Sequence, residues 1–144
     1  MSISRDSTGR PRTAALRPGL AVLFVDPDVE TAERLAQSLP NLSAVAVVPT
    51  AQAAVAAITM RVPDLIVTEL DLPDANGVRL IRSVHDAPLT HRVLILVVTR
   101  RTSFRDKIDA FQAGADDYLV KPVDSEQLAT HVRLVSRFRQ ILSS

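Results

Sequence analysis

Five short apolar runs, spaced along the chain from residue 20, constrain the fold more than any other feature of this sequence. They lie at Leu20–Val25, Ala44–Val48, Leu65–Thr68, Val93–Val98 and Tyr118–Val120. Each run is too short for a buried helix, is rich in Val, Ile and Leu, and shows no alternation of apolar and polar residues. Continuous apolarity of this kind is typical of strands that are buried on both faces of a parallel sheet.

The segments between and after these runs carry apolar residues at steps of three or four, which predicts helices that each turn one apolar stripe toward the sheet. The expected stripes are Val29, Ala32, Leu35, Ala36 and Leu39; Ala51, Ala54, Val55 and Ile58; Gly77, Leu80, Ile81 and Val84; Phe104, Ile108 and Phe111; and Leu128, Val132, Val135, Phe138 and Leu142. Strands therefore alternate with helices along the whole folded region.

Capping residues agree with this pattern. Asp26 is predicted to cap the first helix, with Pro27 at its first position. The expected caps of later helices are Thr50, Ser103 and Asp124 at N-termini and Gly114 at a C-terminus.

Five βα units with right-handed crossovers form an α/β, doubly wound parallel sheet. Such sheets bind ligands at the carboxyl ends of their strands, where the strand order reverses.

Composition excludes several classes of protein. The chain has 144 residues and 47% hydrophobic residues, which suits one domain with a proper core. It has no cysteine, so disulfides, thiolate metal sites and cysteine nucleophiles are absent. No apolar run approaches the roughly 20 residues of a membrane span, and the N-terminus lacks the apolar core of a secretory signal. We expect a cytoplasmic protein whose folded domain makes no membrane contact.

The basic residues are unevenly distributed. Residues 1–19 hold four arginines and one aspartate, and the rest of the chain holds 17 − 4 = 13 basic and 16 − 1 = 15 acidic residues. We therefore expect a disordered basic tail over residues 1–19 and a folded domain over residues 20–142. The tail could touch nucleic acid or anionic lipid, or could be a solvated leader. For the folded domain we expect no direct nucleic-acid binding.

Four polar residues follow four of the predicted strands. Asp26, Glu69, Thr99 and Lys121 come directly after the first, third, fourth and fifth apolar runs. One charged residue in a loop after a strand is unremarkable, but four of complementary chemistry at one edge of a sheet indicate a site. Carboxylates hold divalent cations, while a hydroxyl and an ammonium receive phosphoryl oxygens. This set suits phosphoryl chemistry.

Four stretches carry a resemblance to a known family. They are Val22–Asp26, Pro63–Gly77, Val97–Thr99 and Gly114–Pro122. In order and spacing they resemble a response-regulator receiver domain, from about Leu20 to Leu142. The resemblance implies a flavodoxin-like (βα)5 fold with strand order 2-1-3-4-5, and a role in two-component (phosphorelay) signal transduction. Members of this family are signalling modules, so we expect no enzyme in the ordinary sense.

The resemblance also implies residue roles. Glu69 stands where the family has its phosphorylated aspartate. Thr99 and Lys121 correspond to the hydroxyl and lysine that contact the phosphoryl group. Thr99 and Tyr118 correspond to the switch pair, of which the aromatic ring moves between exposed and buried positions. The Lys121–Pro122 peptide bond is expected to be cis.

Metal binding is expected to be weak. By resemblance, Asp26, Glu69 and Asp71 are the candidate Mg²⁺ ligands. Receivers carry a second acidic residue directly after the first, and here that position is Pro27, which has no side-chain oxygen. Asp28 could reach back, but we expect it to act as an anion in the first helical turn. Mg²⁺ is therefore possible but poorly held.

Glu69 is the second departure from the family. Its extra methylene moves the carboxylate outward by about 1.5 Å, and a misplacement of about 1 Å can cost on the order of 100-fold in rate. Normal phosphorylation is therefore in doubt, and a permanently charged pocket in which Lys121 pairs with Glu69 is plausible. Arg100, which follows Thr99, could cover Glu69, hinder a phosphodonor or simply lie in solvent.

Three function classes follow. The first is an atypical receiver, or pseudo-receiver, that acts through contacts with a histidine kinase or a downstream effector. The second is a working phosphoacceptor that takes a phosphoryl group from a histidine kinase on Glu69 with Mg²⁺. The third is a flavodoxin-like cofactor binder or hydrolase, which the lack of a glycine-rich phosphate loop and of a G-x-S-x-G motif disfavours.

A homodimer through the fourth helix, fifth strand and fifth helix is possible, with the candidate charges Lys107, Asp117, Arg133 and Arg137.

Overall fold

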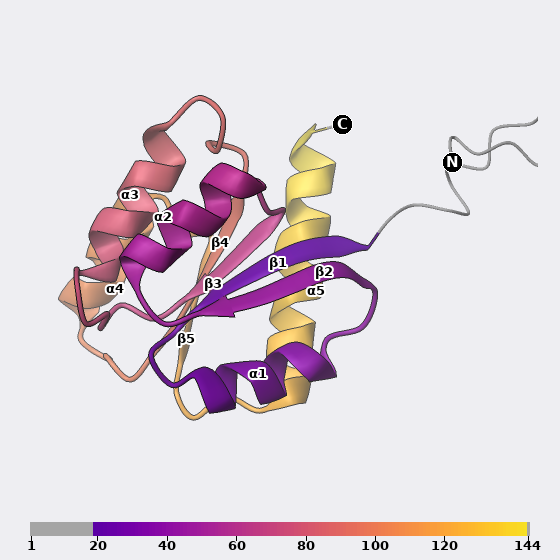
Figure 1. Cartoon of the computed structure of the whole chain (residues 1–144), viewed down its shortest axis with the longest axis horizontal. Helices are drawn as coiled ribbons and strands as arrows, with labels where there is room; N and C mark the ends of the chain where they lie inside the picture. The colour runs from indigo at the N-terminus through magenta and orange to yellow at the C-terminus, as the bar shows by residue number, and fades with distance from the viewer. Residues whose placement is uncertain (1–18, 144) are drawn as a thin grey trace, which may run out of the picture.

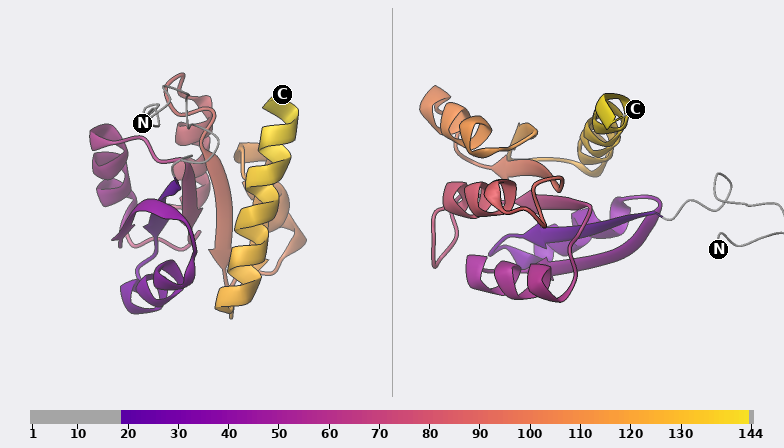
Figure 2. Two further views of the ribbon diagram at one scale, coloured as in Figure 1. Left: turned by 90° about the vertical axis from the view of Figure 1, so that its right-hand side faces the viewer. Right: turned by 90° about the horizontal axis from the view of Figure 1, so that it is seen from above.

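The computed structural model describes residues 19–143, apart from the side chains of 138–143, and shows a parallel sheet with helices on both faces (Figures 1 and 2). Its strands are β1 (Leu20–Val25), β2 (Leu42–Val48), β3 (Leu65–Thr68), β4 (Leu94–Thr99) and β5 (Asp117–Val120). Its helices are α1 (Val29–Ser38), α2 (Ala51–Met60), α3 (Gly77–Asp86), α4 (Phe104–Ala113) and α5 (Ser125–Ser143). Apart from Gly19, the tail predicted at residues 1–19 lies outside this part of the chain.

The strand order is β2-β1-β3-β4-β5 and every neighbouring pair is parallel, which confirms the predicted doubly wound α/β fold. Alternate residues of the central strands pack into two separate hydrophobic cores, one on each face of the sheet. Leu23 and Ile66 face the core under α2, α3 and α4, whereas Phe24 and Leu65 face the core under α1 and α5. In Figure 1, α1 accordingly lies across the sheet from α2 and α3. The polar ends of the strands are left between these two layers.

The edge strand β2 departs from the expected burial. β1, β3 and β4 are buried on both faces, as predicted from their continuous apolarity. In β2, by contrast, Val45 keeps 47% of its surface exposed and Ala46 is also exposed. The apolar run alone predicts burial on both faces, but the strand order implied by the resemblance places β2 at the edge of the sheet, where one side is open.

The predicted helical stripes are correct in part. All four residues expected of α3 are buried. In α4, Phe104 and Phe111 are exposed, whereas Ala110 and Ala113 face the sheet. That helix carries two stripes at helical spacing, and the small alanines pack closer to the sheet than the aromatic rings can. In α2, Val55 is likewise exposed, and Phe138 and Leu142 of the α5 stripe fall among the undescribed side chains.

The cap of α1 corrects another prediction. Asp28, not Asp26, is the N-cap, and its Oδ1 accepts a hydrogen bond from the Thr31 amide at 3.2 Å. Pro27 therefore lies before the helix, and Asp26 Oδ1 accepts from the Asp28 amide at 2.9 Å. The second carboxylate oxygen of Asp26 is left to face the strand ends.

The other predicted caps are confirmed. Thr50 caps α2 and Ser103 caps α4 through their side-chain oxygens. Asp124 Oδ1 accepts from the Gln127 amide in the first turn of α5 at 2.7 Å. Gly114 closes α4 with a φ of 127°, a backbone region that favours glycine.

Candidate functional site

A largely buried lysine joins two carboxylates at the carboxyl end of the sheet. Lys121, directly after β5, donates to Asp26 Oδ2 at 2.8 Å and to Glu69 Oε1 at 3.0 Å. Its backbone amide donates to the carbonyl of Thr99 at the end of β4, also at 2.8 Å. The predicted convergence of these four residues from separate strands is thus confirmed, as is the cis peptide bond between Lys121 and Pro122.

The three charged side chains lie together and are largely shielded from solvent. The side chains of Lys121, Asp26 and Glu69 keep only 13%, 13% and 8% of their surface exposed. Burial by itself lowers the pKa of Lys121, but the hydrogen bonds and negative charges of Asp26 and Glu69 outweigh it, so the pKa is raised above its ordinary value. The ammonium is charged at neutral pH, and one positive charge faces two negative ones.

Glu69 folds back on its own loop. Its Oε2 accepts hydrogen bonds from the amides of Leu70 at 2.7 Å and Asp71 at 3.1 Å, while Oε1 takes the Lys121 ammonium. With Asp26 held by Lys121 and by the Asp28 amide, all four carboxylate oxygens have a donor. This arrangement leaves each buried charge hydrogen-bonded, as low-dielectric surroundings require.

Arg101 adds an ion pair that the sequence did not reveal. Its Nε and Nη2 reach Asp71 Oδ1 at 2.8 and 2.6 Å, and its Nη1 reaches Asp106 Oδ1 at 3.4 Å. Asp71 raises the pKa of Arg101, first through this hydrogen bonding and second through its negative charge. The only sequence signal was a second arginine after Thr99. Its neighbour Arg100 is exposed, which favours the interpretation of Arg100 as a solvated loop residue.

Tyr118 is tied to the same loop. Its hydroxyl donates to the Arg101 carbonyl at 2.8 Å, which links β5 to the segment between β4 and α4. The ring is half-buried, with its centroid 6.3 Å from that of Phe111 and 5.9 Å from Lys107 Nζ. Burial, with a smaller effect from the charge of Asp106, raises the pKa of Tyr118.

The residues at the strand ends do not fit a magnesium site well. Pro27 offers no side-chain oxygen, and the Asp71 carboxylate is directed to Arg101. The facing oxygens of Asp26 and Glu69 already hold an ammonium. Among the described side chains, those of residues 19–137, no cluster of three or more suited to a metal ion occurs. Hard cations need several oxygen ligands, so the expected set of Asp26, Glu69 and Asp71 stays a prediction.

The candidate dimer residues lie on α4, β5 and α5, but one of them has a partner inside the domain. Asp117 Oδ2 lies 2.6 Å from His131 Nδ1, and its Oδ1 accepts from the Tyr118 amide. Arg133 and Arg137 are exposed, and Lys107 lies against the Tyr118 ring. The cross-paired dimer stays a prediction.

Comparison with known proteins decides the family. A family model described as the response regulator receiver domain matches residues 22–133. The chain belongs to this family. Receiver domains are signalling modules of two-component systems, and the flavodoxin-like strand order agrees with this assignment. No helix in the described part of the chain has the length and apolarity needed to cross a bilayer.

The receiver has relatives among transcriptional regulators. It is 36% identical over 83 residues to the transcriptional regulatory protein PhoP of Escherichia coli, a match that covers 58% of this chain and 36% of PhoP. It is 40% identical over 77 residues to the KDP operon transcriptional regulatory protein KdpE of the same organism, covering 54% and 33%. The chain thus spans about a third of the length of these relatives.

A solved structure supports the same fold. The CheY-like response regulator receiver domain protein from Methanospirillum hungatei superposes with a TM-score of 0.77 at 25% identity. The match covers 83% of this chain and 95% of that one.

Proposed function

We propose that this receiver is a pseudo-receiver, whose output depends on protein contacts and not on phosphorylation. Glu69 occupies the phosphoacceptor position, and its charge takes the place of a transferred group. Candidate partners are a histidine kinase or a downstream effector, and the regulatory names of PhoP and KdpE favour a role in gene regulation. The setting is the cytoplasm.

One observation carries the proposal: both oxygens of the Glu69 carboxylate are engaged. Oε1 is held by Lys121, and Oε2 is held by the amides of Leu70 and Asp71. To attack a phosphodonor, one of these oxygens has to break its hydrogen bonds. Only 8% of the surface of the Glu69 side chain is exposed to solvent. In-line attack depends on placement within about 1 Å, so a carboxylate held against its own loop is a poor nucleophile.

The expected weak binding of Mg²⁺ supports the same conclusion. When Mg²⁺ is bound in a receiver, it neutralises the charge of the phosphoryl group during transfer. Here Pro27 removes one oxygen ligand, and Lys121 already neutralises part of the charge of Asp26 and Glu69. Two separate defects therefore oppose phosphorylation.

A second function keeps Glu69 as an acceptor. It is favoured by the gathering of Glu69, Asp26, Lys121 and Thr99 at one end of the sheet, which is the set that a phosphoryl group needs. In this case the Glu69 carboxylate attacks the phosphorus of a phosphohistidine on the kinase, the P–N bond breaks with the imidazole as leaving group, and an acyl phosphate forms on Glu69.

Labelling of four proteins by acetyl phosphate with Mg²⁺ separates the two functions. The proteins are wild type, Glu69→Asp, Pro27→Asp and the double variant, each read by intact mass. Only the double variant should gain one phosphoryl group in good yield, because the defects act on one transition state and are non-additive. Ready labelling of wild type, removed by hydroxylamine, would replace the pseudo-receiver proposal with the second function.

A further inference from the structure

The side of the molecule formed by β2 and α2 carries no charge along a long stretch of chain. From Leu35 to Met60 the sequence contains no Asp, Glu, Lys, Arg or His, although 23% of all residues are charged. This stretch includes the whole of β2 and α2. Three large apolar side chains on or just after it are strongly exposed: Val45 at 47%, Val55 at 53% and Met60 at 86%. Exposed apolar side chains in an uncharged stretch make this edge of the molecule a candidate interaction site.

The open edge of β2 lacks the usual protection. Edge strands present unpaired backbone groups, and proteins commonly guard them with charges, Pro or short length. The opposite edge follows this rule: β5 spans only Asp117–Val120, with Asp117 and Lys121 at its ends. β2 is longer, from Leu42 to Val48, and contains neither a charged residue nor a proline.

The backbone register shows which groups of β2 are free to pair. The Val48 carbonyl accepts from the Asp26 amide on the β1 side. Because successive peptide groups of a strand point to opposite sides, Ala46 also faces β1, whereas the N–H and C=O groups of Val45 and Val47 point to the open edge. These two residues can pair with another strand at no loss of hydrogen bonds to β1.

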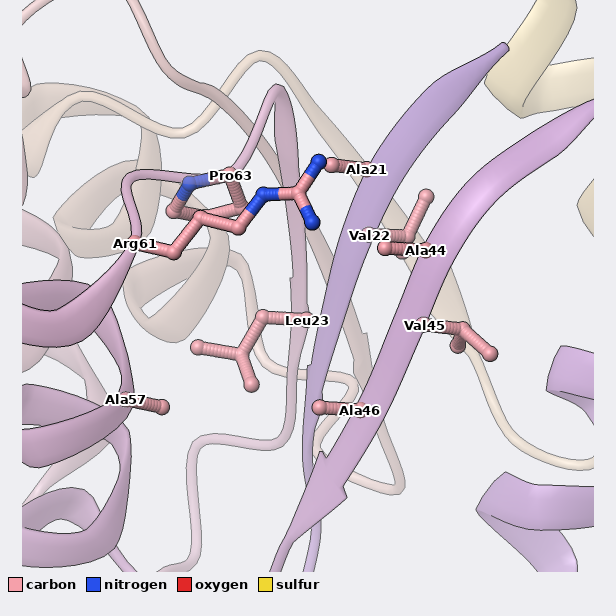
Figure 3. A pocket seen from close by; sticks show the side chains of 9 residues that line it. All are labelled: Ala21, Val22, Leu23, Ala44, Val45, Ala46, Ala57, Arg61 and Pro63. Carbon is pink, nitrogen blue, oxygen red and sulfur yellow. The ribbon is translucent and has the colours of Figure 1, made fainter.

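A groove runs between β2 and α2 on one face of the sheet. It has a volume of about 230 Å³ and is lined by small residues on both sides, among them Ala44, Ala46 and Ala57 (Figure 3). Figure 3 shows Arg61 at the upper end of the groove, beyond the exposed part of the strand. The space exists because alanines leave the gap between helix and strand unfilled. A side chain from a neighbouring molecule could occupy it.

We infer that β2 is the interface of a homodimer, in which the β2 strands of two copies pair antiparallel across a two-fold axis. The axis is perpendicular to the sheet, so the two sheets become continuous and both α2 helices lie on the same face. Val45 and Ala46 lie at the middle of the strand, close to the axis. This interface is separate from the candidate dimer face on α4, β5 and α5, and it does not depend on the proposed function of Glu69.

The properties of the surface favour a second copy as the occupant. A two-fold axis brings each surface against itself. The two β2 strands then meet with no charged side chain on either of them, and Arg61 lies at the end of the groove, beyond the exposed part of the strand. Across an axis at Ala46, the outward groups of Val45 and Val47 meet those of Val47 and Val45 of the other copy, in a sequence, Val45-Ala46-Val47, that reads the same from both ends. Charges that would oppose this pairing are absent from both strands.

The test is sedimentation of the full chain over concentrations up to about 1 mM. Wild type should show a monomer–dimer equilibrium, and Val45→Lys should weaken it at least about tenfold, because it brings two like charges close together near the axis. Gln112→Lys, which adds the same charge at an exposed position on α4, should dimerise as wild type does. Circular dichroism should show Val45→Lys to be folded, since that side chain is half exposed.

Hydrogen exchange supplies a second readout that involves no substitution. On raising the concentration, the amides of Val45 and Val47 should become protected, while that of Ala46, which faces β1, should be protected throughout. A wild type that stays monomeric would overturn the inference. So would a dimer that Val45→Lys leaves intact and Arg133→Glu disrupts, since that result places the interface on α5.

Discussion

Replacing Lys121 with methionine should destabilise the domain far more than replacing the other lysine of the chain, Lys107. Methionine keeps an unbranched apolar side chain of similar length and removes only the ammonium. The substitution leaves Asp26 and Glu69 facing each other with side-chain exposures of 13% and 8% and no cation between them. Removal of one partner from a buried ion pair is costly because the remaining charge stays desolvated.

The magnitude follows from the hydrogen bonds at the site. Loss of one partner of a fully buried pair costs about 3–5 kcal/mol. Here both carboxylates keep backbone donors, the amides of Asp28, Leu70 and Asp71, and a little solvent contact. We therefore expect a loss of about 3 kcal/mol, at the low end of that range. For a domain of this size, that corresponds to a fall in Tm of about 10 °C.

A double-mutant cycle with Glu69→Gln tests the cause. With Lys121 present, Glu69→Gln removes a charged hydrogen bond and should cost about 1 kcal/mol. With methionine at 121, the same change removes one of two repelling charges and should restore about 1 kcal/mol. The effect of Glu69→Gln should thus change sign between the two backgrounds. A simple loss of packing at Lys121 would produce no such reversal.

Urea unfolding followed by circular dichroism measures these free energies, since the chain has no tryptophan to report by fluorescence. Lys107→Met is the matched control. Its ammonium lies 5.9 Å from the Tyr118 ring centroid in a partly exposed position, so its loss should cost less than about 1 kcal/mol. Equal losses for the two lysine variants, or the same sign of the Glu69→Gln effect in both backgrounds, would refute the reasoning.

Two further predictions concern metal binding and alkaline pH. Pro27→Asp should bind Mg²⁺ more tightly than wild type in titration calorimetry, because it adds a carboxylate ligand. The control Pro40→Asp, at an exposed position after α1, should bind Mg²⁺ as wild type does. Equal affinities for Pro27→Asp and wild type would show that another group already serves as the ligand. Because the pKa of Lys121 is raised above 10.5 in the folded chain, its contribution to stability should be fully present at neutral pH and be lost as the pH rises through that higher value. The stability difference between wild type and Lys121→Met should therefore shrink above about pH 10.5, and a constant difference up to about pH 12 would contradict this.

The sequence was sufficient to predict the parallel sheet and the position of the site. Buried parallel strands are apolar throughout, and their carboxyl ends meet at one edge of the sheet, so the sequence alone predicts that Asp26, Glu69, Thr99 and Lys121 come together. Local spacing carried this information, because Asp26, Glu69 and Lys121 directly follow their strands and Thr99 is the last residue of β4.

Features that depend on distant parts of the chain were missed. The exposure of β2 follows from its edge position, which is a property of the whole sheet. In α4, periodicity could not decide between the stripe of Phe104 and Phe111 and that of Ala110 and Ala113. The pair of Arg101 and Asp71 joins two loops, and the path of a long flexible side chain leaves no periodic signal in the sequence.

The state of the Glu69 carboxylate is the central claim, and the amides of Leu70 and Asp71 report on it directly. Both donate to Glu69 Oε2, so their NMR resonances should move if that carboxylate is phosphorylated or released. The measurement is a proton–nitrogen correlation spectrum of the wild-type chain before and after adding acetyl phosphate with Mg²⁺. We predict that the two amide peaks stay in place. A new set of peaks for Leu70, Asp71 and Thr99 that appears with the donor and decays when it is removed would contradict the account.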